Sequence, residues 1–325
     1  MEAGPPGPER ASSVISIDVR YRIRPWLVLL LLAGVCVSII ALVAHLRSRR
    51  HSTAALLARL PSDDAVILSI DFEALRRAGM LDALAGPDAL QEPEYRVFVA
   101  DSGFNYREDL DLALVSFHRT GAYFVLRGRF NWKVLGDYVV RQGGSCYNSL
   151  CQMAGSTPER KISYYPLHSN LMALAVAKDE QAALELGLRR SGRPQPSIPS
   201  QPVWAFIPGS VLKKAQALPA GARAFARLLE GAEALVLTLG VQGNRLEVLL
   251  EVTCRSGQEA ASLVSQLEKT TSLLRELIAR ENQQPNPRDL SGVLTAGVFR
   301  QQDGRVIGRW PVERGFLEAL TGGAL

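Results

Sequence analysis

The sequence predicts an α+β protein in which one membrane-spanning helix precedes two related modules. Three observations lead to this prediction: an uncharged run from Trp26 to Ala44, a repeated order of strands and helices after it, and a proline-rich joint between the repeats. Each module is expected to run strand, helix, hairpin, helix, hairpin, helix. It is expected to form an antiparallel sheet with helices against one face.

The apolar run is long enough to cross a bilayer. Its nineteen residues would span roughly 28 Å as a helix, close to the hydrocarbon thickness of a membrane. A cleaved secretory signal has a shorter apolar core and an uncharged cleavage site, whereas Arg47, Arg49 and Arg50 follow this run. The sequence therefore predicts an uncleaved transmembrane helix over residues 25–46.

The flanks of this helix are predicted to be a flexible basic tail over 1–24 and a juxtamembrane stalk over 47–60. Within the tail, residues 15–24 alternate between apolar and polar, which leaves open a strand that pairs with the sheet edge of a partner. Four arginines precede the helix and four follow it, so the positive-inside rule does not set the orientation. We expect the large C-terminal part to be extracytoplasmic (periplasmic), because long domains translocate largely regardless of charge.

The rest of the chain is predicted to be a duplication, with repeat 1 over 61–192, a proline-rich linker over 193–201 and repeat 2 over 202–325. AVILSIDFEALRRAG in the first repeat corresponds to VWAFIPGSVLKKAQA in the second, and two hairpins follow in each. The second hairpins are expected to turn at Ser169-Asn170 and at Asp303-Gly304. Only the first repeat has an insertion at 86–110, which makes that segment a place to look for function.

The charge of the chain gives no sign of nucleic-acid binding. Residues 1–50 carry seven basic and three acidic side chains, whereas the remaining residues carry thirty and twenty-nine. The net charge of +5 therefore belongs mainly to the N-terminal segment, and a basic stripe typical of nucleic-acid binders is missing from the rest. We expect no nucleic acid among the partners, and no cofactor motif is present.

The cysteines offer one close pair, Cys146 and Cys151. Five positions apart, they are suited either to a small disulfide or to two free thiols, and the sequence leaves both open. They do not form a CxxC motif. His118 and His168 do not supply further ligands at zinc-site spacing, so no metal site is predicted.

A serine and a lysine form the one catalytic pattern in the sequence. Ser210 and Lys213 match Ser-x-x-Lys at a strand-to-helix junction, as in serine β-lactamases. The accompanying Ser-Asp-Asn and Lys-Thr-Gly motifs are absent, and the corresponding positions in the first repeat are Glu73 and Arg76. A structural helix start explains the pattern more simply.

Two further groups of residues are candidates for binding. The first lies in the polar segment that begins DSGFNYRED and includes Asp101, Asn105, Tyr106 and Asp109. A calcium loop would need a differently placed glycine and a glutamate where Leu112 stands, so a turn with side chains bonded to nearby amides is the simpler interpretation. The second group consists of aromatic residues that could line a groove or cover a core: Trp132, Tyr147, Tyr164 and Tyr165.

The stretch LPSDDAVILSIDFEALRRAGML resembles the start of uncharacterised bacterial membrane-anchored extracytoplasmic proteins. These commonly begin with Leu-Pro, a small acidic turn, a strand and an LR-type helix. The resemblance implies a single-pass anchor and an extracytoplasmic domain, and it implies no activity.

Three functions remain as hypotheses from the sequence. The first is a membrane-tethered extracytoplasmic binding or assembly module, with the lipid bilayer and another envelope protein as partners. The second is an envelope serine hydrolase that uses Ser210 and Lys213. The third is a domain that binds lipid or another apolar ligand between its sheet and its helices.

Overall fold

A computed structural model of the chain describes residues 52–85, 93–157, 159–189, 198–212, 227–242, 245–281, 284–313, 315–316 and 319. The chain divides into two compact units, residues 1–51 and residues 52–325, and all described residues belong to the second unit. The predicted tail and the predicted membrane helix therefore lie outside the described residues.

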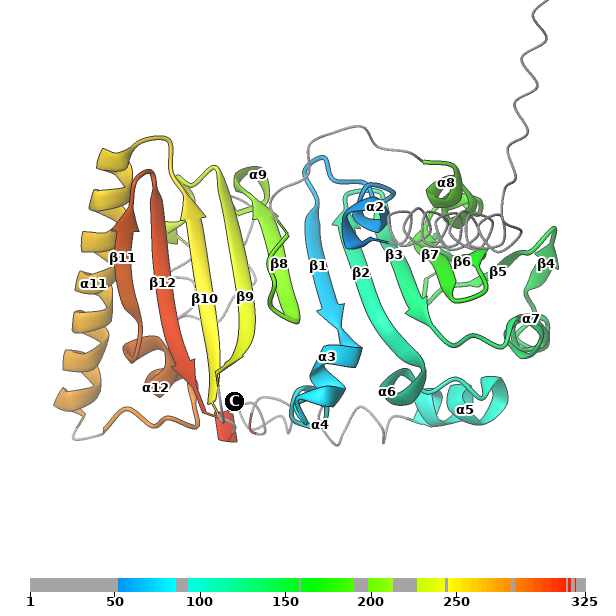
Figure 1. The fold of residues 1–325 in the computed structure, drawn as a ribbon, viewed down its shortest axis with the longest axis horizontal. Helices are drawn as coiled ribbons and strands as arrows, with labels where there is room; N and C mark the ends of the chain where they lie inside the picture. The colour runs from blue at the N-terminus through cyan, green and yellow to red at the C-terminus, as the bar shows by residue number, and fades with distance from the viewer. Residues whose placement is uncertain are drawn as a thin grey trace, which may run out of the picture. The chain divides into compact units, whose positions relative to one another are not determined.

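The predicted fold class, a membrane-spanning helix followed by two α+β modules, is wrong; whether the modules share one sheet was left open by the sequence. The strands form one twelve-stranded sheet, in the order β11-β12-β10-β9-β8-β1-β2-β3-β7-β6-β5-β4 (Figure 1). Every neighbouring pair is antiparallel. The strands are β1 (Val66–Asp71), β2 (Leu110–His118), β3 (Gly121–Gly128), β4 (Ser145–Tyr147), β5 (Leu150–Ala154), β6 (Lys161–His168), β7 (Leu171–Ala177), β8 (Val203–Pro208), β9 (Ala234–Gln242), β10 (Arg245–Thr253), β11 (Val298–Gln302) and β12 (Arg305–Val312).

No helix in the described part of the chain is long and apolar enough to cross a bilayer. This finding corrects the predicted single-pass membrane location.

The two halves of the sheet meet at β1 and β8. Outward from this pair, β8-β9-β10-β12-β11 repeats the order β1-β2-β3-β7-β6, and β5 and β4 extend the first half only. Under the correspondence suggested by the sequence, Leu68 is equivalent to Ala205, and these two residues are paired across the junction. The first strand of each half therefore pairs with its counterpart, which merges both halves into one sheet.

Helices pack on both faces of the sheet, not on one face as the sequence suggested. On one face, α2 and α8 contribute Leu56, Leu57 and Leu186 to a core with Leu114 and Ala173. On the opposite face, α5 and α7 cover the first half, and α11 and α12 cover the second (Figure 1). The described helices are α2 (Thr53–Leu57), α3 (Phe72–Arg77), α4 (Leu81–Ala85), α5 (Pro93–Ser102), α6 (Tyr106–Asp109), α7 (Trp132–Arg141), α8 (Ala182–Leu188), α9 (Gly209–Leu212), α11 (Gly257–Arg280) and α12 (Leu290–Thr295).

The segment predicted as a stalk contributes to the folded domain. Leu56 in α2 and Leu60 in the turn after it are almost completely buried in the core. Arg59, between them, donates hydrogen bonds to the carbonyl oxygens of Leu186 and Gly187 at the end of α8. Residues 53–60 therefore pack against the sheet as part of the domain.

Side chains set the starts of several helices. Ser52, Asp71, Asn131, Ser256 and Asp289 each accept a backbone hydrogen bond in the first turn of α2, α3, α7, α11 and α12. Each such cap typically stabilises a helix by about 1 kcal/mol. The sequence therefore specifies these helix starts locally.

The two predicted second hairpins turn where expected. Ser169 and Asn170 lie between β6 and β7, and Asp303 and Gly304 lie between β11 and β12. Asp303 has a φ of 52°, a left-handed conformation that aspartate tolerates better than most residues.

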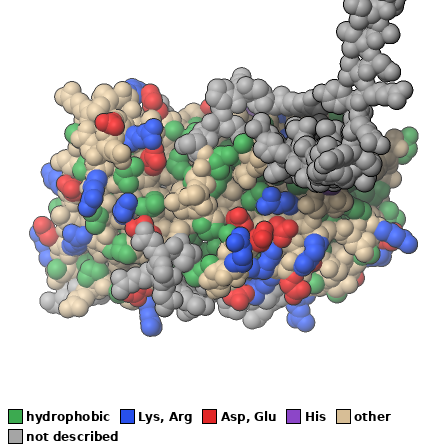
Figure 2. Space-filling view, viewed as in Figure 1, with side chains coloured by type: hydrophobic (Ala, Val, Ile, Leu, Met, Phe, Trp, Pro, Cys, Tyr) green, Lys and Arg blue, Asp and Glu red, His purple; other side chains and the backbone are tan. Residues whose placement is uncertain are grey.

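Charged side chains of both signs gather over α3, α4 and α6 in Figure 2. Arg76 on α3 donates to the backbone carbonyls of Arg107 and Leu110 and pairs with Asp111 at 3.0 Å. This arginine therefore connects α3 to the start of β2, and the surface around it is a mixture of charges without a single sign.

Candidate functional site

An apolar cavity of about 250 Å³ lies between α5, α7 and the first half of the sheet. Four of its lining residues, Leu135, Val139, Tyr164 and Met172, are buried, whereas the other lining residues are half-buried. The lining residues are Phe98, Phe104, Leu126, Phe130, Leu135, Tyr138, Val139, Met153, Ile162, Tyr164, Met172 and Leu174.

The sequence builds this cavity through two periodicities. Alternation along β3, β6 and β7 turns Leu126, Tyr164 and Met172 to the face opposite the α2–α8 core. Along α7, Leu135 and Val139 lie four residues apart on the side that meets the sheet. The cap at Asn131 fixes where α7 begins and so which of its side chains face inward.

A continuous run of aromatic rings surrounds one side of the cavity. Phe98 packs edge-on against Tyr138 with ring centroids 5.2 Å apart, and it also contacts Phe104 at 6.3 Å. Phe104 stacks on Phe130 at 5.5 Å, and Phe130 lies 5.1 Å from Trp132. These rings come from three segments of the chain, and their rigid faces hold the cavity open without polar groups.

Tyr164 brings a buried hydroxyl group to the cavity wall. Its side chain is buried, with 8% of the residue exposed, and its ring lies 6.4 Å from that of Trp132. The hydroxyl oxygen has no hydrogen-bond partner among the described residues. Burial raises the pKa of this hydroxyl to about 12, so it stays protonated and can donate a hydrogen bond at neutral pH.

A second hollow, a cleft of about 340 Å³, adjoins the cavity at Tyr164. Its walls include Gly136 and the oppositely charged Lys133 and Asp137 on α7. The other wall is the hairpin of β4 and β5. Tyr164 belongs to the described lining residues of both hollows, so its ring separates the cavity from the cleft.

A disulfide between Cys146 and Cys151 closes this hairpin wall. The two cysteines are directly paired across β4 and β5, with Cα atoms 4.0 Å apart. The intervening Asn148 and Ser149 have φ values of 47° and 67°, as a tight two-residue turn requires. Of the two chemistries that the sequence left open, the structure has the disulfide.

Reducing this disulfide is expected to destabilise the protein by roughly 2 kcal/mol, because a loop of this length then regains its freedom in the unfolded chain. A Cys146→Ser/Cys151→Ser variant compared with the wild type in urea would measure the change. Cys254→Ser serves as the control, since Cys254 is a free thiol in β10's following loop. An unchanged midpoint in the double variant would contradict this prediction.

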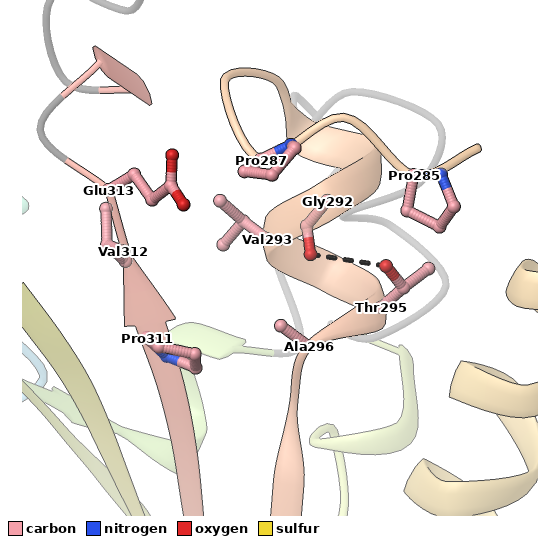
Figure 3. Close-up of a pocket in the computed structure, with 9 residues that line it drawn as sticks. All are labelled: Pro285, Pro287, Gly292, Val293, Thr295, Ala296, Pro311, Val312 and Glu313. Carbon is pink, nitrogen blue, oxygen red and sulfur yellow. Dashed lines mark hydrogen bonds between the residues drawn. The ribbon is translucent and has the colours of Figure 1, made fainter.

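A third hollow, of about 340 Å³, lies in the second half (Figure 3). Figure 3 shows α12 and two prolines, Pro285 and Pro287, on one side of it and the end of β12 on the other. Its charged side chain, Glu313, is exposed, and Thr295 is bonded within α12 to the carbonyl of Gly292. These features do not form a set of convergent polar groups, so the cavity beside α7 is the stronger candidate.

Of the candidate Ser-x-x-Lys pair, the structure describes only the serine. The Ser210 hydroxyl donates to a carboxylate oxygen of Asp64 at 2.6 Å, which connects α9 to the segment before β1. Lys213 lies outside the described residues.

The predicted polar segment forms a turn that is held by hydrogen bonds and an ion pair. Asn105 caps α6, and its backbone N–H donates to Asp109, whose carboxylate also pairs with Arg129 at 3.1 Å. Tyr106 packs against aromatic rings, and the Asp101 carbonyl accepts a hydrogen bond from Arg141. The described residues contain no cluster of side chains that could hold a metal ion.

Of the four predicted aromatic residues, the structure brings only two together. Trp132 and Tyr164 share the cleft, whereas Tyr165 faces the opposite side of the sheet and Tyr147 is 80% exposed on β4. The strand alternation of Tyr164 and Tyr165 already implied this separation.

Sequence reasoning missed most of the lining residues. Phe98 and Phe104 lie in the one-copy insertion at 86–110, which was singled out as a segment, but their contact with β6 and β7 is long-range. The available signal was the density of aromatic residues in this insertion and in the segment before α7.

The chain is distantly similar to solved structures. No protein-family model and no curated protein matches the chain. Three crystal forms of TP0453, forms IV, I and III, align with TM-scores of 0.48, 0.48 and 0.46. Each is 10% identical, and the alignments cover 82% of this chain and 95–97% of the other.

Proposed function

We propose that this protein binds a small apolar ligand, such as a hydrocarbon chain, in the cavity between α7 and the first half of the sheet. The observation that carries the proposal is the cavity itself: about 250 Å³, lined almost entirely by aliphatic and aromatic side chains. Cavities of about 150 Å³ with such a lining stay dry and bind small hydrocarbons. A larger one has room for a longer apolar group.

The composition of the wall also favours an adaptable binding site over an accidental packing defect. Met153 and Met172 lie on two different strands of the wall, and methionine side chains adjust to ligands of different shape. The aromatic rings opposite them are held in place by their mutual contacts. A rigid rim beside a flexible wall is suited to hydrocarbon chains, which offer no polar groups for recognition.

The proposal predicts that the full-length protein binds N-phenyl-1-naphthylamine, a neutral dye that fluoresces in apolar surroundings. Met172→Trp is expected to weaken binding roughly tenfold, since the larger side chain removes contacts with about two methylene equivalents. Met153→Trp, at a half-buried position on the same wall, is expected to do the same with less risk to folding.

Met80→Trp is the matched control for these variants. Met80 is buried to a similar degree as Met172, with 8% and 5% exposed, but it packs in a different core cluster. Thermal unfolding shows which variants keep the fold. If folded Met172→Trp and Met153→Trp bind the dye as tightly as Met80→Trp and the wild type, the ligand does not occupy this cavity and the proposal is wrong.

A further inference from the structure

The hydroxyl of Tyr164 has a stability cost that the described protein groups do not offset. It is a buried donor without a partner among the described residues, and leaving such a group unpaired destabilises a fold. Phenylalanine at this position would fill the same space without that cost. A tyrosine here is therefore explained if something outside the protein accepts its hydrogen bond.

Gly136 makes the space for such an acceptor. This glycine lies in the middle of α7, where glycine is less favourable than alanine. A Cβ at this position would stand 4.0 Å from the Tyr164 hydroxyl oxygen and 3.8 Å from the Cys146 sulfur, which is ordinary contact and no clash. Packing alone does not require glycine, and its missing side chain leaves a gap on the cleft side of the buried hydroxyl.

The charges of the cleft indicate which kind of acceptor fits. Lys133 and Asp137 lie one helical turn apart on the cleft wall, so the positive charge of one compensates the negative charge of the other. Burial around Tyr164 also disfavours negative charge, and for this reason it raises the pKa of the hydroxyl. An ionised carboxylate beside it would meet the same desolvation cost. An uncharged oxygen is the better match.

We propose that the Tyr164 hydroxyl donates a hydrogen bond to an uncharged carbonyl oxygen, such as that of an ester, on the ligand whose apolar chain occupies the cavity. This inference rests on the proposed function and adds the class of ligand: a neutral acyl ester. Tyr164 lines both the cavity and the cleft, so a ligand with its chain in the cavity reaches the hydroxyl at the boundary.

The test measures displacement of N-phenyl-1-naphthylamine by methyl octanoate, by octanoate and by nonane. In Tyr164→Phe, the affinity for methyl octanoate is expected to fall roughly tenfold relative to the wild type, as for a lost buried hydrogen bond. The affinities for the dye and for nonane are expected to change much less, because the ring stays in the cavity wall and only the hydroxyl is removed. The free Tyr164→Phe protein is expected to be at least as stable as the wild type, because an unpaired hydroxyl is removed.

Two further variants separate this inference from its alternatives. Gly136→Leu, which fills the space beside the hydroxyl, is expected to weaken binding of methyl octanoate but not of nonane. Lys133→Ala is expected to change neither, because the acceptor is uncharged. Tighter binding of octanoate than of methyl octanoate, reduced by Lys133→Ala, would overturn the neutral class.

The outcomes also distinguish the inference from the proposed function. If the wild type binds neither the dye nor nonane, the proposed apolar site fails. If it binds both, but Tyr164→Phe binds methyl octanoate as tightly as the wild type does, the role of the hydroxyl is overturned and the apolar site stands.

Discussion

Trp204→Ala is expected to destabilise both halves of the sheet, by about 3–5 kcal/mol, because truncating a buried aromatic residue leaves a large cavity. Trp204 lies on β8, in the second half of the sequence, yet only 4% of it is exposed and it packs in the core cluster of the first half. Its loss removes packing inside this cluster at the junction of β1 and β8, where Trp204 is paired with Ser69.

Hydrogen exchange measured by mass spectrometry would show where protection is lost. In Trp204→Ala we expect weaker protection in β1, β2 and β7 as well as in β8 and β9. Trp310→Ala is the matched control, because Trp310 is 8% exposed and packs in a cluster whose described members all lie in the second half, including Phe299 at 5.3 Å. Protection loss confined to residues 203–312 in Trp204→Ala would mean that the halves unfold independently.

The sequence predicted local features well because local interactions determine them. The Asp303-Gly304 turn follows from the backbone preferences of two neighbouring residues, and the helix start at Asn131 follows from its own side chain. The close spacing of Cys146 and Cys151 in one hairpin allowed a disulfide without any long-range information.

The joining of the halves could not be read in the same way. VILSID and VWAFIP are apolar strands whose patterns would be the same at a protected edge or beside another strand. Pairing between Ile67 and Phe206 depends on residues more than a hundred positions apart, and nothing in either strand alone specifies that partner. For this reason the sequence left open whether the two repeats share one sheet.

The candidate site was predictable only in part. The aromatic residues Trp132, Tyr147, Tyr164 and Tyr165 were identified as candidates. Strand alternation would have assigned Tyr164 and Tyr165 to opposite faces. The contribution of Phe98 depends on α5 packing against α7, with its ring 5.2 Å from that of Tyr138. That contact joins an insertion to a helix some forty residues later, and hydrophobic periodicity does not encode it.

A second large effect is expected at Gly209, the residue before Ser210 in the Ser-x-x-Lys pattern. Gly209→Ala is expected to destabilise the protein by about 3 kcal/mol or more. Its backbone N–H donates to the carbonyl of Glu233 at 2.9 Å, and a Cβ would lie well inside van der Waals contact with the carbonyl oxygen of Ala232. Because the obstacle is backbone, α9 and the chain entering β9 must move apart.

Gly231→Ala, shortly before β9, is the matched control, because a Cβ at this position meets nothing within 4 Å. Its effect on the free energy of unfolding should stay within about 0.5 kcal/mol. Ser210→Ala removes one exposed hydrogen bond to Asp64 and should cost no more than about 1 kcal/mol. Urea unfolding of the three variants would give this order of stabilities. A larger loss for Ser210→Ala than for Gly209→Ala would contradict the view that close backbone packing, rather than the serine hydroxyl, determines the sequence at this junction.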